Sequence, residues 1–573
     1  MRKTNTKDGI TIKAFAGTTG VLIAFNVTDA KRKGLLGFSI ERRDPETNKW
    51  EWMSGMMPFP EQAHDAGSLI STDVAPIQKF RWSDYRVHHE TTYSYRVHGM
   101  YGTPANPKLV KGPEITVTTS SADEDGVNNV IFNRAAGASQ AFLRNFPEAV
   151  KLMEEKRKNG GFSKLTVDDL EKVSPRCKEW LTRGVLPNIL ATIAAAKNEN
   201  WALDIAIYEY EWHEIVDAVN DALKRGVHIR LLYHAKKGDA QTKENKDNAE
   251  PLIKKGCAKE RTTSAIFHDK FIVLSKVIKK AAGIERKPLT VLCGSTNFTH
   301  NGLFRQANVV HIVRTEKGEN SNPTADKYEI LFNTIWNGDN NVALTPGETS
   351  KWITANYPME PKTPLFAGFS PRKGKGDLAH FINLIEAAKA DVIFSTAFVL
   401  PKEIIDALVG KAGDPILRLG IQNTNANKIA GFHRDKTAQF AATALADHGF
   451  EAWLKEATIA GAGNILIHTK IVVVDFTTDS PVIISGSHNL SGPASEKNDE
   501  NYLVIQGNTD LADSYGVEVM RIYDHYRARW VAQEMAKKRS AVMGTLQPSD
   551  KWTDRYFKKD SLHFRDRLRF IGN

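Results

Sequence analysis

IFHDKFIVL (residues 266–274) is followed by VLCGSTN (residues 291–297), and ILIHTKIVVVD (residues 465–475) is followed by IISGSHN (residues 483–489). Both pairs place His-x-Lys in an apolar segment and Gly-Ser-x-Asn after a second apolar segment. Apolar segments of this length are typical of buried strands. The shared order of these features predicts that the chain contains two diverged copies of one structural unit.

The spacing of the polar residues predicts where their side chains point. His268 and Lys270 are two positions apart, so on a strand both face one side of the sheet, and the same holds for His468 and Lys470. Each Gly-Ser-x-Asn adds neutral hydrogen-bond donors after a tight exit from the next strand. Two such half-sites facing each other would enclose an anion between a nucleophile and an acid, which suits in-line displacement at phosphorus.

The alternative interpretation of these residues is structural. A single histidine in a strand most often serves packing, and a lysine beside a strand is most often a solvated edge residue. Two copies, each followed by an apolar strand and Gly-Ser-x-Asn, are hard to produce by chance. We therefore favour a catalytic role for the repeated pattern.

These motifs resemble the duplicated His-x-Lys motifs of the phospholipase D superfamily, over about residues 180 to 530. The second copy is complete, because Asp475 follows its lysine and Glu500 lies in the later Asn-Asp-Glu-Asn string. The first copy departs from the family pattern: Ser275 stands at the acidic position, and Gln306 or Asn308 replaces the later Glu. The resemblance implies a pseudo-twofold α/β fold of two mixed sheets flanked by helices.

The resemblance also implies catalytic roles. In this family one histidine forms a phosphohistidine and the other protonates the leaving oxygen, and the roles reverse for water. We expect His268 to be the nucleophile and His468 the general acid. The reverse assignment stays open, because Glu500 is expected to hold a ring nitrogen of His468.

The remaining predicted site residues are expected to hold the phosphoryl oxygens. They are Lys270, Lys470, Asn297 and Asn489, with Ser295 and Ser487 in support. No metal or other cofactor is expected, because the lysines supply the positive charge.

The chain is too long for one hydrophobic core, so several domains are expected. Residues 1–120 alternate apolar and polar residues between turn signals, which predicts a β-sandwich, and Tyr93 and Tyr95 in a late segment resemble a fibronectin type III module. Alternating strand and helix patterns further on favour parallel pairing and helix-covered sheets. The expected divisions are a linker and helical segment at 121–183, a first half-unit at 184–345, a second at 346–535, and a basic aromatic tail at 536–573.

The composition is that of a globular protein with a moderate positive charge. The 573 residues include 77 Lys+Arg and 67 Asp+Glu, a net charge of +10 that favours polyanionic partners. The 3 cysteines fit neither a disulfide framework nor a zinc site, which indicates a reducing compartment. No signal-peptide pattern or membrane-spanning apolar run is visible, so we expect a cytoplasmic protein without integral membrane association.

Three functions remain open from the sequence: a nuclease acting on DNA or RNA, with DNA favoured; a phospholipase D or phosphatidyltransferase acting on phospholipids; and an inert nucleic-acid-binding protein. The Gly-Ser-His-Asn string is similar to that of small bacterial endonucleases of the superfamily, which favours the nuclease. Both half-sites lie on one chain, so an oligomer is possible but not required.

The C-terminal segment bears on the same choice. Residues 521–573 contain 13 Lys/Arg against 6 Asp/Glu. Basic residues contact a nucleic-acid backbone and aromatic residues stack on bases, but the same aromatic residues can equally pack in a core. The aromatic residues concerned are Trp530, Trp552, Tyr556, Phe557 and Phe564.

Overall fold

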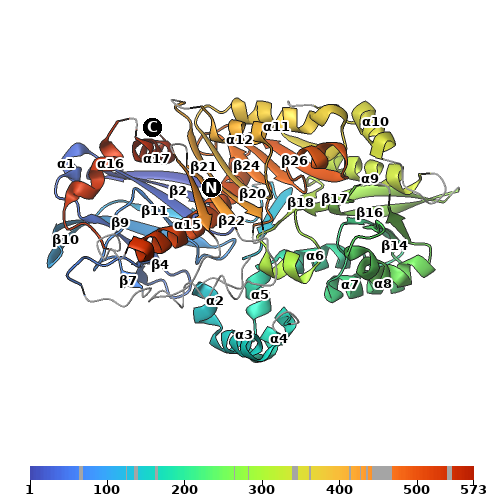
Figure 1. The fold of residues 1–573 in the computed structure, drawn as a ribbon, viewed down its shortest axis with the longest axis horizontal. Helices are drawn as coiled ribbons and strands as arrows, with labels where there is room; N and C mark the ends of the chain where they lie inside the picture. Colours follow the sequence, from blue (N-terminus) through green and yellow to red (C-terminus); the bar gives the residue numbers. More distant parts are fainter. Residues whose placement is uncertain are drawn as a thin grey trace.

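The structure is a computed structural model. It describes residues 1–62, 69–123, 125–134, 140–161, 165–262, 265–281, 283–338, 346–359, 363–411, 414–425, 428–433, 436–441, 467–538, 545–559 and 561–572. Figure 1 shows an all-β region at one end of the molecule, which continues into two α/β units, and a small group of helices that projects from one side.

The N-terminal region consists of antiparallel sheets that share one core. The alternation that predicted its strands is confirmed, since Ile10, Ile12 and Ala14 are buried while Thr11 and Lys13 between them are half-buried. One sheet has the order β1 (Arg2–Lys7), β2 (Ile10–Ala16), β3 (Val21–Val27) and β8 (Arg81–Asp84). The other has the order β10 (Asn106–Val110), β9 (Thr92–Thr103), β4 (Gly37–Arg43) and β5 (Trp50–Trp52), and β11 (Glu114–Thr118) also pairs with β9.

The segment after this region is partly a strand. Within the segment 121–183, expected as linker and helices, β12 (Asn128–Phe132) pairs with β18 (Val309–Arg314) at the edge of the next sheet. The projecting helices follow it: α2 (Gln140–Asn145), α3 (Pro147–Asn159), α4 (Val167–Val173) and α5 (Cys177–Thr182).

Two mixed sheets form the α/β part. The first has the order β12, β18, β17 (Gly283–Gly294), β16 (Lys270–Lys280), β13 (Trp201–Ile207), β14 (His228–His234) and β15 (Ala258–Arg261). The second has the order β19 (Leu365–Ser370), β26 (Glu500–Gln506), β25 (Val482–Gly486), β24 (Ile471–Val474), β20 (Asp391–Ala397), β21 (Leu417–Asn425), β22 (Lys428–His433) and β23 (Lys436–Ala441).

The two sheets repeat one topology. β13 is parallel to β14 and antiparallel to β16, just as β20 is parallel to β21 and antiparallel to β24. The predicted duplication is therefore confirmed. The expectation of parallel sheets is wrong for most pairs, because each motif strand returns as an antiparallel hairpin, β16 with β17 and β24 with β25.

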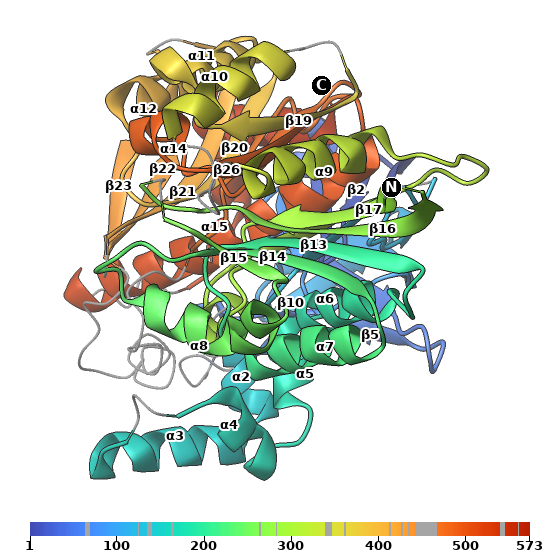
Figure 2. The ribbon, with the colours of Figure 1, turned by 90° about the vertical axis from the view of Figure 1, so that its right-hand side faces the viewer.

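Helices cover the outer faces of the two sheets. Figure 2 shows α7 and α8 on one outer side and α10, α11 and α12 on the other, with the sheets between them. The helices of the first unit are α6 (Val185–Ala194), α7 (His213–Lys224), α8 (Gln241–Lys254) and α9 (Pro323–Trp336). Those of the second are α10 (Pro346–Asn356), α11 (Gly376–Glu386), α12 (Lys402–Val409), α14 (Gly492–Glu496) and α15 (Thr509–Lys538). No helix in the described part of the chain is long and apolar enough to span a membrane.

The two ends of the chain pack together. Nε of Arg2 donates to Oδ1 of Asp513 on α15 at 2.7 Å, and the ring of Phe15 lies 5.1 Å from that of Phe476. The C-terminal helices α16 (Asp554–Phe557) and α17 (Leu562–Ile571) lie beside the N-terminal strands in Figure 1. The N-terminal region is therefore built into the same packed body as the second α/β unit.

This packing shows the role of two of the C-terminal aromatic residues. Trp552 and Tyr556 are 2% and 5% exposed and belong to the core of the N-terminal region. Nε1 of Trp552 donates to the carbonyl of Leu35 at 2.8 Å, and its ring stacks on Phe80 at 5.3 Å. Base stacking is therefore excluded for these two residues in this structure. The side chain of Trp530 lies outside the described residues.

Candidate active site

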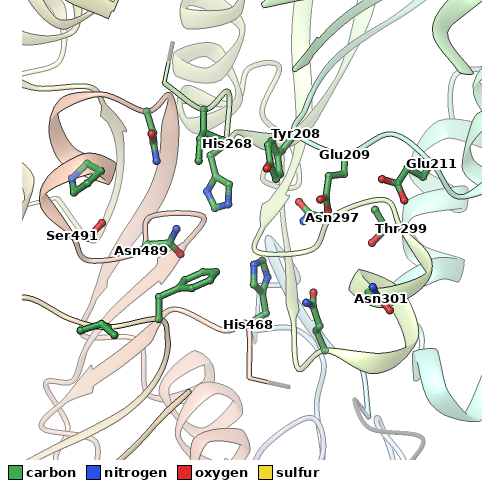
Figure 3. A pocket seen from close by; sticks show the side chains of 16 residues that line it. Tyr208, Glu209, Glu211, His268, Asn297, Thr299, Asn301, His468, Asn489 and Ser491 are labelled. Carbon is green, nitrogen blue, oxygen red and sulfur yellow. Dashed lines mark hydrogen bonds between the residues drawn. The ribbon is translucent and has the colours of Figure 1, made fainter. Parts of the chain in front are cut away.

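The two motif histidines face each other across one pocket. The ring centroids of His268 and His468 lie 6.4 Å apart, and Figure 3 shows the rings pointing toward each other from opposite sides. The pocket has a volume of about 590 Å³, within the usual range for small-molecule sites. The predicted convergence of two distant segments is therefore present in the structure.

Backbone contacts between the two half-units place the histidines. The N–H of His268 donates to the carbonyl of Asp499 at 2.9 Å, and the N–H of His468 donates to the carbonyl of Ala307 at 3.0 Å. Each histidine thus precedes its motif strand, which begins at Lys270 in the first unit and at Ile471 in the second. The prediction that both residues of each His-x-Lys lie within the strand is wrong, because His268 precedes its strand by two positions and His468 by three.

Each imidazole is oriented by a residue of the opposite half-unit. Nδ1 of His268 lies 2.7 Å from Oε2 of Glu500, and Nδ1 of His468 lies 2.9 Å from Oδ1 of Asn308. The expectation that Glu500 holds His468 is wrong, because the half-units interlock and bring each orienting residue beneath the other histidine. Both Nε2 atoms are left to face a substrate.

The motif serines complete the same two networks. The hydroxyl of Ser487 donates to Oε2 of Glu500 at 2.7 Å, and the hydroxyl of Ser295 donates to Oδ1 of Asn308 at 2.9 Å. Neither serine lines the pocket. In this structure the two hydroxyls hold the orienting residues, and the expected support of phosphoryl oxygens by Ser295 and Ser487 stays a prediction.

The two lysines are buried behind the histidines. Nζ of Lys270 donates to the carbonyl of His268 at 2.7 Å, and Nζ of Lys470 donates to the carbonyl of His468 at 2.6 Å. Each ammonium has two further protons for another acceptor. Both lysines are 2% exposed, so their charges act in a medium of low polarity.

Burial of these cations changes their titration. Burial lowers the pKa of Lys270 to about 8 and that of Lys470 well below its usual value, the latter also because the two ammonium groups repel each other. Burial, and then the two lysines, lower the pKa of both His268 and His468. An anion placed between the two ammonium groups would offset this repulsion, so the arrangement favours binding of a phosphate.

The two motif asparagines line the pocket. Nδ2 of Asn297 donates to Oε2 of Glu209 at 2.5 Å, which fixes the orientation of the amide. In the described structure Oδ1 of Asn297 and Oδ1 of Asn489 are buried without a hydrogen-bond partner. Both asparagines can therefore contact a ligand, as the sequence predicts.

Asp475 lies away from the pocket. Its Oδ1 accepts hydrogen bonds from the backbone N–H groups of Lys389 and Ala390 at 2.8 and 2.7 Å, at the start of β20. The predicted catalytic role of Asp475 is therefore not supported, and the residue fixes a turn at the far end of β24. Ser275, the corresponding residue of the first unit, is fully buried.

Several pocket residues carry no motif that the sequence analysis recognised. Tyr208 follows β13 and Phe398 follows β20, and their rings lie 5.3 Å from His268 and 6.0 Å from His468. The signal that could have found them is their equivalent position after the first strand of each unit. The equivalent position also identifies Asn308, and not Gln306, as the residue that corresponds to Glu500. Asn308 follows Ser295 by 13 residues, and Glu500 follows Ser487 by 13.

The walls flanking the pocket differ between the two units. After Tyr208 come Glu209 and Glu211, both in the pocket wall, whereas after Phe398 comes Val399, which is 67% exposed. Burial raises the pKa of Glu209, and burial together with Glu209 and Glu244 raises the pKa of Glu211 to about 8. One wall is therefore acidic and the other apolar.

Among the described residues one group has the composition of a metal site, and it lies outside the pocket. Asp168, His213 and Glu214 bring their ligand atoms within 4.8 Å of one another. Nζ of Lys178 already contacts the carboxylates of Asp168 and Glu214, so an ammonium holds the position that a cation would need.

Comparison with known proteins identifies the duplicated unit. The family model described as "Cardiolipin synthase, PLD-like domain" matches residues 189–336 and 381–523, about half of the chain. No curated protein matches the chain.

Three solved structures illustrate the range of similar folds. A phospholipase D family member, Nuc from Salmonella typhimurium, is 19% identical over 26% of this chain and 86% of its own, with a TM-score of 0.21. Phosphatidylserine synthase from Haemophilus influenzae Rd KW20 is 12% identical over 68% of this chain and 94% of its own, with a TM-score of 0.41. Polyphosphate kinase from Porphyromonas gingivalis is 11% identical over 57% of this chain and only 46% of its own, with a TM-score of 0.33.

Proposed function

Because this chain belongs to the phospholipase D superfamily of phosphodiester-processing enzymes, we propose that it cleaves phosphodiesters through a phosphohistidine on His268. The observation that carries the proposal is the pair of facing imidazoles, 6.4 Å apart, each with Nδ1 already bonded. Their Nε2 atoms can take the two ends of an in-line displacement, with a phosphate between them.

The reaction has two steps. First, Nε2 of His268 attacks phosphorus, the bond from phosphorus to the leaving oxygen breaks, and His468 gives its Nε2 proton to that oxygen. Then neutral His468 takes a proton from water, the water oxygen attacks phosphorus, and the phosphorus–nitrogen bond breaks. Lys270 and Lys470 offset the negative charge on the phosphoryl oxygens in both steps.

The surroundings of the two histidines favour this assignment of roles. The ring that carries the phosphoryl group becomes positively charged, and the carboxylate of Glu500 beside Nδ1 of His268 stabilises that charge. Nδ1 of His468 meets only the neutral amide of Asn308, which makes its protonated form a stronger acid. The carboxylate beside His268 therefore suits a nucleophile, and the neutral amide beside His468 suits an acid.

We propose nucleic acid as the substrate, with DNA favoured. The basic rim consists of three exposed lysines that adjoin pocket-lining residues. Nζ of Lys236 donates to the carbonyl of Ala265 at 3.3 Å, and the backbone carbonyl of Lys497 accepts from the N–H of Ala265, which precedes Ile266 of the pocket. Lys375, which also pairs with Glu403, lies against Gly492, next to Ser491 of the pocket. Together with the net charge of +10, this basic rim supports a polyanion that continues beyond the scissile phosphate.

A phospholipid is the second candidate substrate, and one observation favours it. Val399, at the pocket wall, is an exposed apolar side chain at 67% exposure, and it follows the aromatic ring of Phe398. An exposed apolar side chain beside an active site can contact an acyl chain or a membrane surface.

The experiment that tests the proposal compares substrates under chelation. Purified protein is incubated in EDTA with plasmid DNA, single-stranded oligonucleotide, phosphatidylcholine vesicles and bis-p-nitrophenyl phosphate. We expect multiple-turnover cleavage of the nucleic acids and of the small diester, with turnover abolished by His468→Ala and retained by Glu496→Gln on the exposed face of α14. Choline release without nucleic-acid cleavage would select the lipid, and no hydrolysis of any diester would overturn the proposed function.

A further inference from the structure

The acidic wall of the pocket is unexpected beside a site that binds phosphate. Figure 3 shows Glu209, Glu211, Thr299 and Asn301 together on one side of the two histidines, opposite Asn489 and Ser491. Where they are ionised, these carboxylates repel a further phosphate group on that side. The wall therefore suits an uncharged part of a nucleic acid, while its next phosphates lie elsewhere.

The carboxylate of Glu211 lacks a counter-ion. In the described part of the chain it makes no hydrogen bond or ion pair, and the charged groups that influence it most, Glu209 and Glu244, are also acidic. Its pKa of about 8 reflects this environment. A hydrogen-bond donor placed against Glu211 would relieve an unfavourable arrangement that the empty pocket retains.

A third acceptor belongs to the same wall and is independent of the acidic pair. Asn297 is 5% exposed, and its Oδ1 has no hydrogen-bond partner among the described residues. Because its Nδ2 is bonded to Glu209, the amide cannot turn around to present a donor instead. Such a buried, unpaired carbonyl costs free energy unless a ligand supplies the donor.

An aromatic surface adjoins these acceptors. Tyr208, next to Glu209 in the chain, is partly exposed and lines the same pocket. A flat ring beside a set of acceptors is the combination that binds a nucleobase by stacking and by its amino edge. Carboxylates are established acceptors for the N4 amino group of cytosine.

We propose that this wall is a nucleobase subsite, in which the two hydrogens of a base's amino group are accepted by oxygen atoms among Glu209, Glu211 and Oδ1 of Asn297. The inference rests on the proposed function, because it places the base beside the phosphodiester that His268 attacks. The enzyme accordingly prefers an amino-bearing base such as cytosine over uracil, which has a carbonyl at the same position. With Glu211 ionised, which holds above its pKa of about 8, uracil would put one more acceptor against three acceptors.

The test compares two substrates that differ only at this position. The measurements are made at pH 8.5, above the pKa of about 8 of Glu211, so that this carboxylate is mostly ionised. The p-nitrophenyl esters of CMP and UMP are hydrolysed by the wild type, and kcat/KM is measured for each. We expect the cytidine ester to be favoured by about tenfold or more. In Glu211→Gln the side-chain amide can donate to O4 of uracil, so the ratio should fall to about one. The matched control, Glu250→Gln on the exposed face of α8, should keep the wild-type ratio.

Binding gives a second readout that does not need turnover. Calorimetric titration of the wild type with CMP and UMP should show the same order of affinity, and Glu211→Gln should remove the difference. Equal kcat/KM and equal affinity for the two nucleotides would overturn the subsite while leaving the phosphodiesterase intact. Faster hydrolysis of p-nitrophenyl phosphocholine than of the cytidine ester would show that the wall binds a quaternary amine, and this result would also overturn the nucleobase subsite. Failure to hydrolyse any ester, with the binding preference intact, would count against the proposed function alone.

Discussion

The carboxylate of Glu500 lies 2.7 Å from Nδ1 of His268, although 232 residues separate them in the chain. The corresponding contact of the other half-unit joins Asn308 to His468 at 2.9 Å. The pseudo-twofold arrangement thus exchanges a carboxylate for a neutral amide, and two identical side chains acquire different chemistry. The predictions below follow from this difference and from the burial of the site.

The covalent intermediate should be trapped on one histidine. p-Nitrophenolate leaves without protonation, so His468→Ala should still form the phosphohistidine on His268 from bis-p-nitrophenyl phosphate. Hydrolysis of this intermediate should be slow in the variant, because no base activates water. Intact-protein mass spectrometry should detect the adduct, and peptide mapping should place it at His268. An adduct in His268→Ala would reverse the assignment of roles.

Removing the charge from Glu500 should slow the reaction without unfolding the protein. In Glu500→Gln the amide can still accept from Nδ1 of His268, but it no longer stabilises the positive ring of the intermediate, so kcat should fall by about 100-fold. Steady-state kinetics and thermal unfolding measure the two effects separately. An unchanged kcat in a folded variant would show that the carboxylate has no part in catalysis. Glu496→Gln, the same change at an exposed residue, is the matched control and should keep the wild-type kcat.

Activity and stability should respond to high pH in opposite directions. The pKa of Lys270 is lowered to about 8 by burial, so its ammonium is lost above that pH and kcat/KM should fall between about pH 8 and 10. Across the same window the unfolded chain binds a proton that the folded chain has lost, so the contribution of Lys270 to the free energy of unfolding should rise with pH. Measurements of kcat/KM and of urea unfolding from pH 7 to 10 check both signs.

Replacing that lysine separates the two effects. Lys270→Met should lower kcat/KM and raise the free energy of unfolding at pH 7 by on the order of 2 kcal/mol, because a buried cation is replaced by an apolar side chain. A flat kcat/KM profile for the wild type, or a less stable Lys270→Met, would contradict this account of the site.

The sequence predicted the duplicated α/β units and the pocket residues His268, Asn297, His468 and Asn489 because these depend on local patterns. His-x-Lys and Gly-Ser-x-Asn repeat, and in each unit they flank an antiparallel hairpin, β16 with β17 and β24 with β25. The partner of each histidine could not be predicted, because it depends on how the two half-units interlock. The acidic wall was missed for a related reason: Glu209 and Glu211 follow a strand without any motif, and only the fold places them beside Asn297.

Trp552 tests the interpretation of the C-terminal aromatic residues. Its ring packs against Phe38 and Phe80 in the N-terminal core, so Trp552→Ala should lower the free energy of unfolding by about 3–5 kcal/mol. Under conditions in which the variant stays folded, its affinity for DNA should match that of the wild type. Weaker DNA binding with unchanged stability would show that the residue contacts nucleic acid instead.

Asn308 offers the sharpest test of the asymmetry between the histidines. Asn308→Asp places a carboxylate against Nδ1 of His468, which should raise the pKa of that imidazole and keep it protonated to higher pH. For a poor leaving group such as a nucleoside hydroxyl, which needs the acid, the pH profile of kcat should extend upward. For p-nitrophenolate, a leaving group that needs no acid, the pH profile of kcat should not change.

Asn308→Asp should also lower stability. It removes the donation from Nδ2 of Asn308 to the carbonyl of Gly302, at 2.9 Å, so the free energy of unfolding should fall by about 1–3 kcal/mol, which thermal unfolding measures. Equal shifts for both leaving groups would mean that His468 is not the acid, and no shift in a folded variant would mean that Asn308 only packs against it.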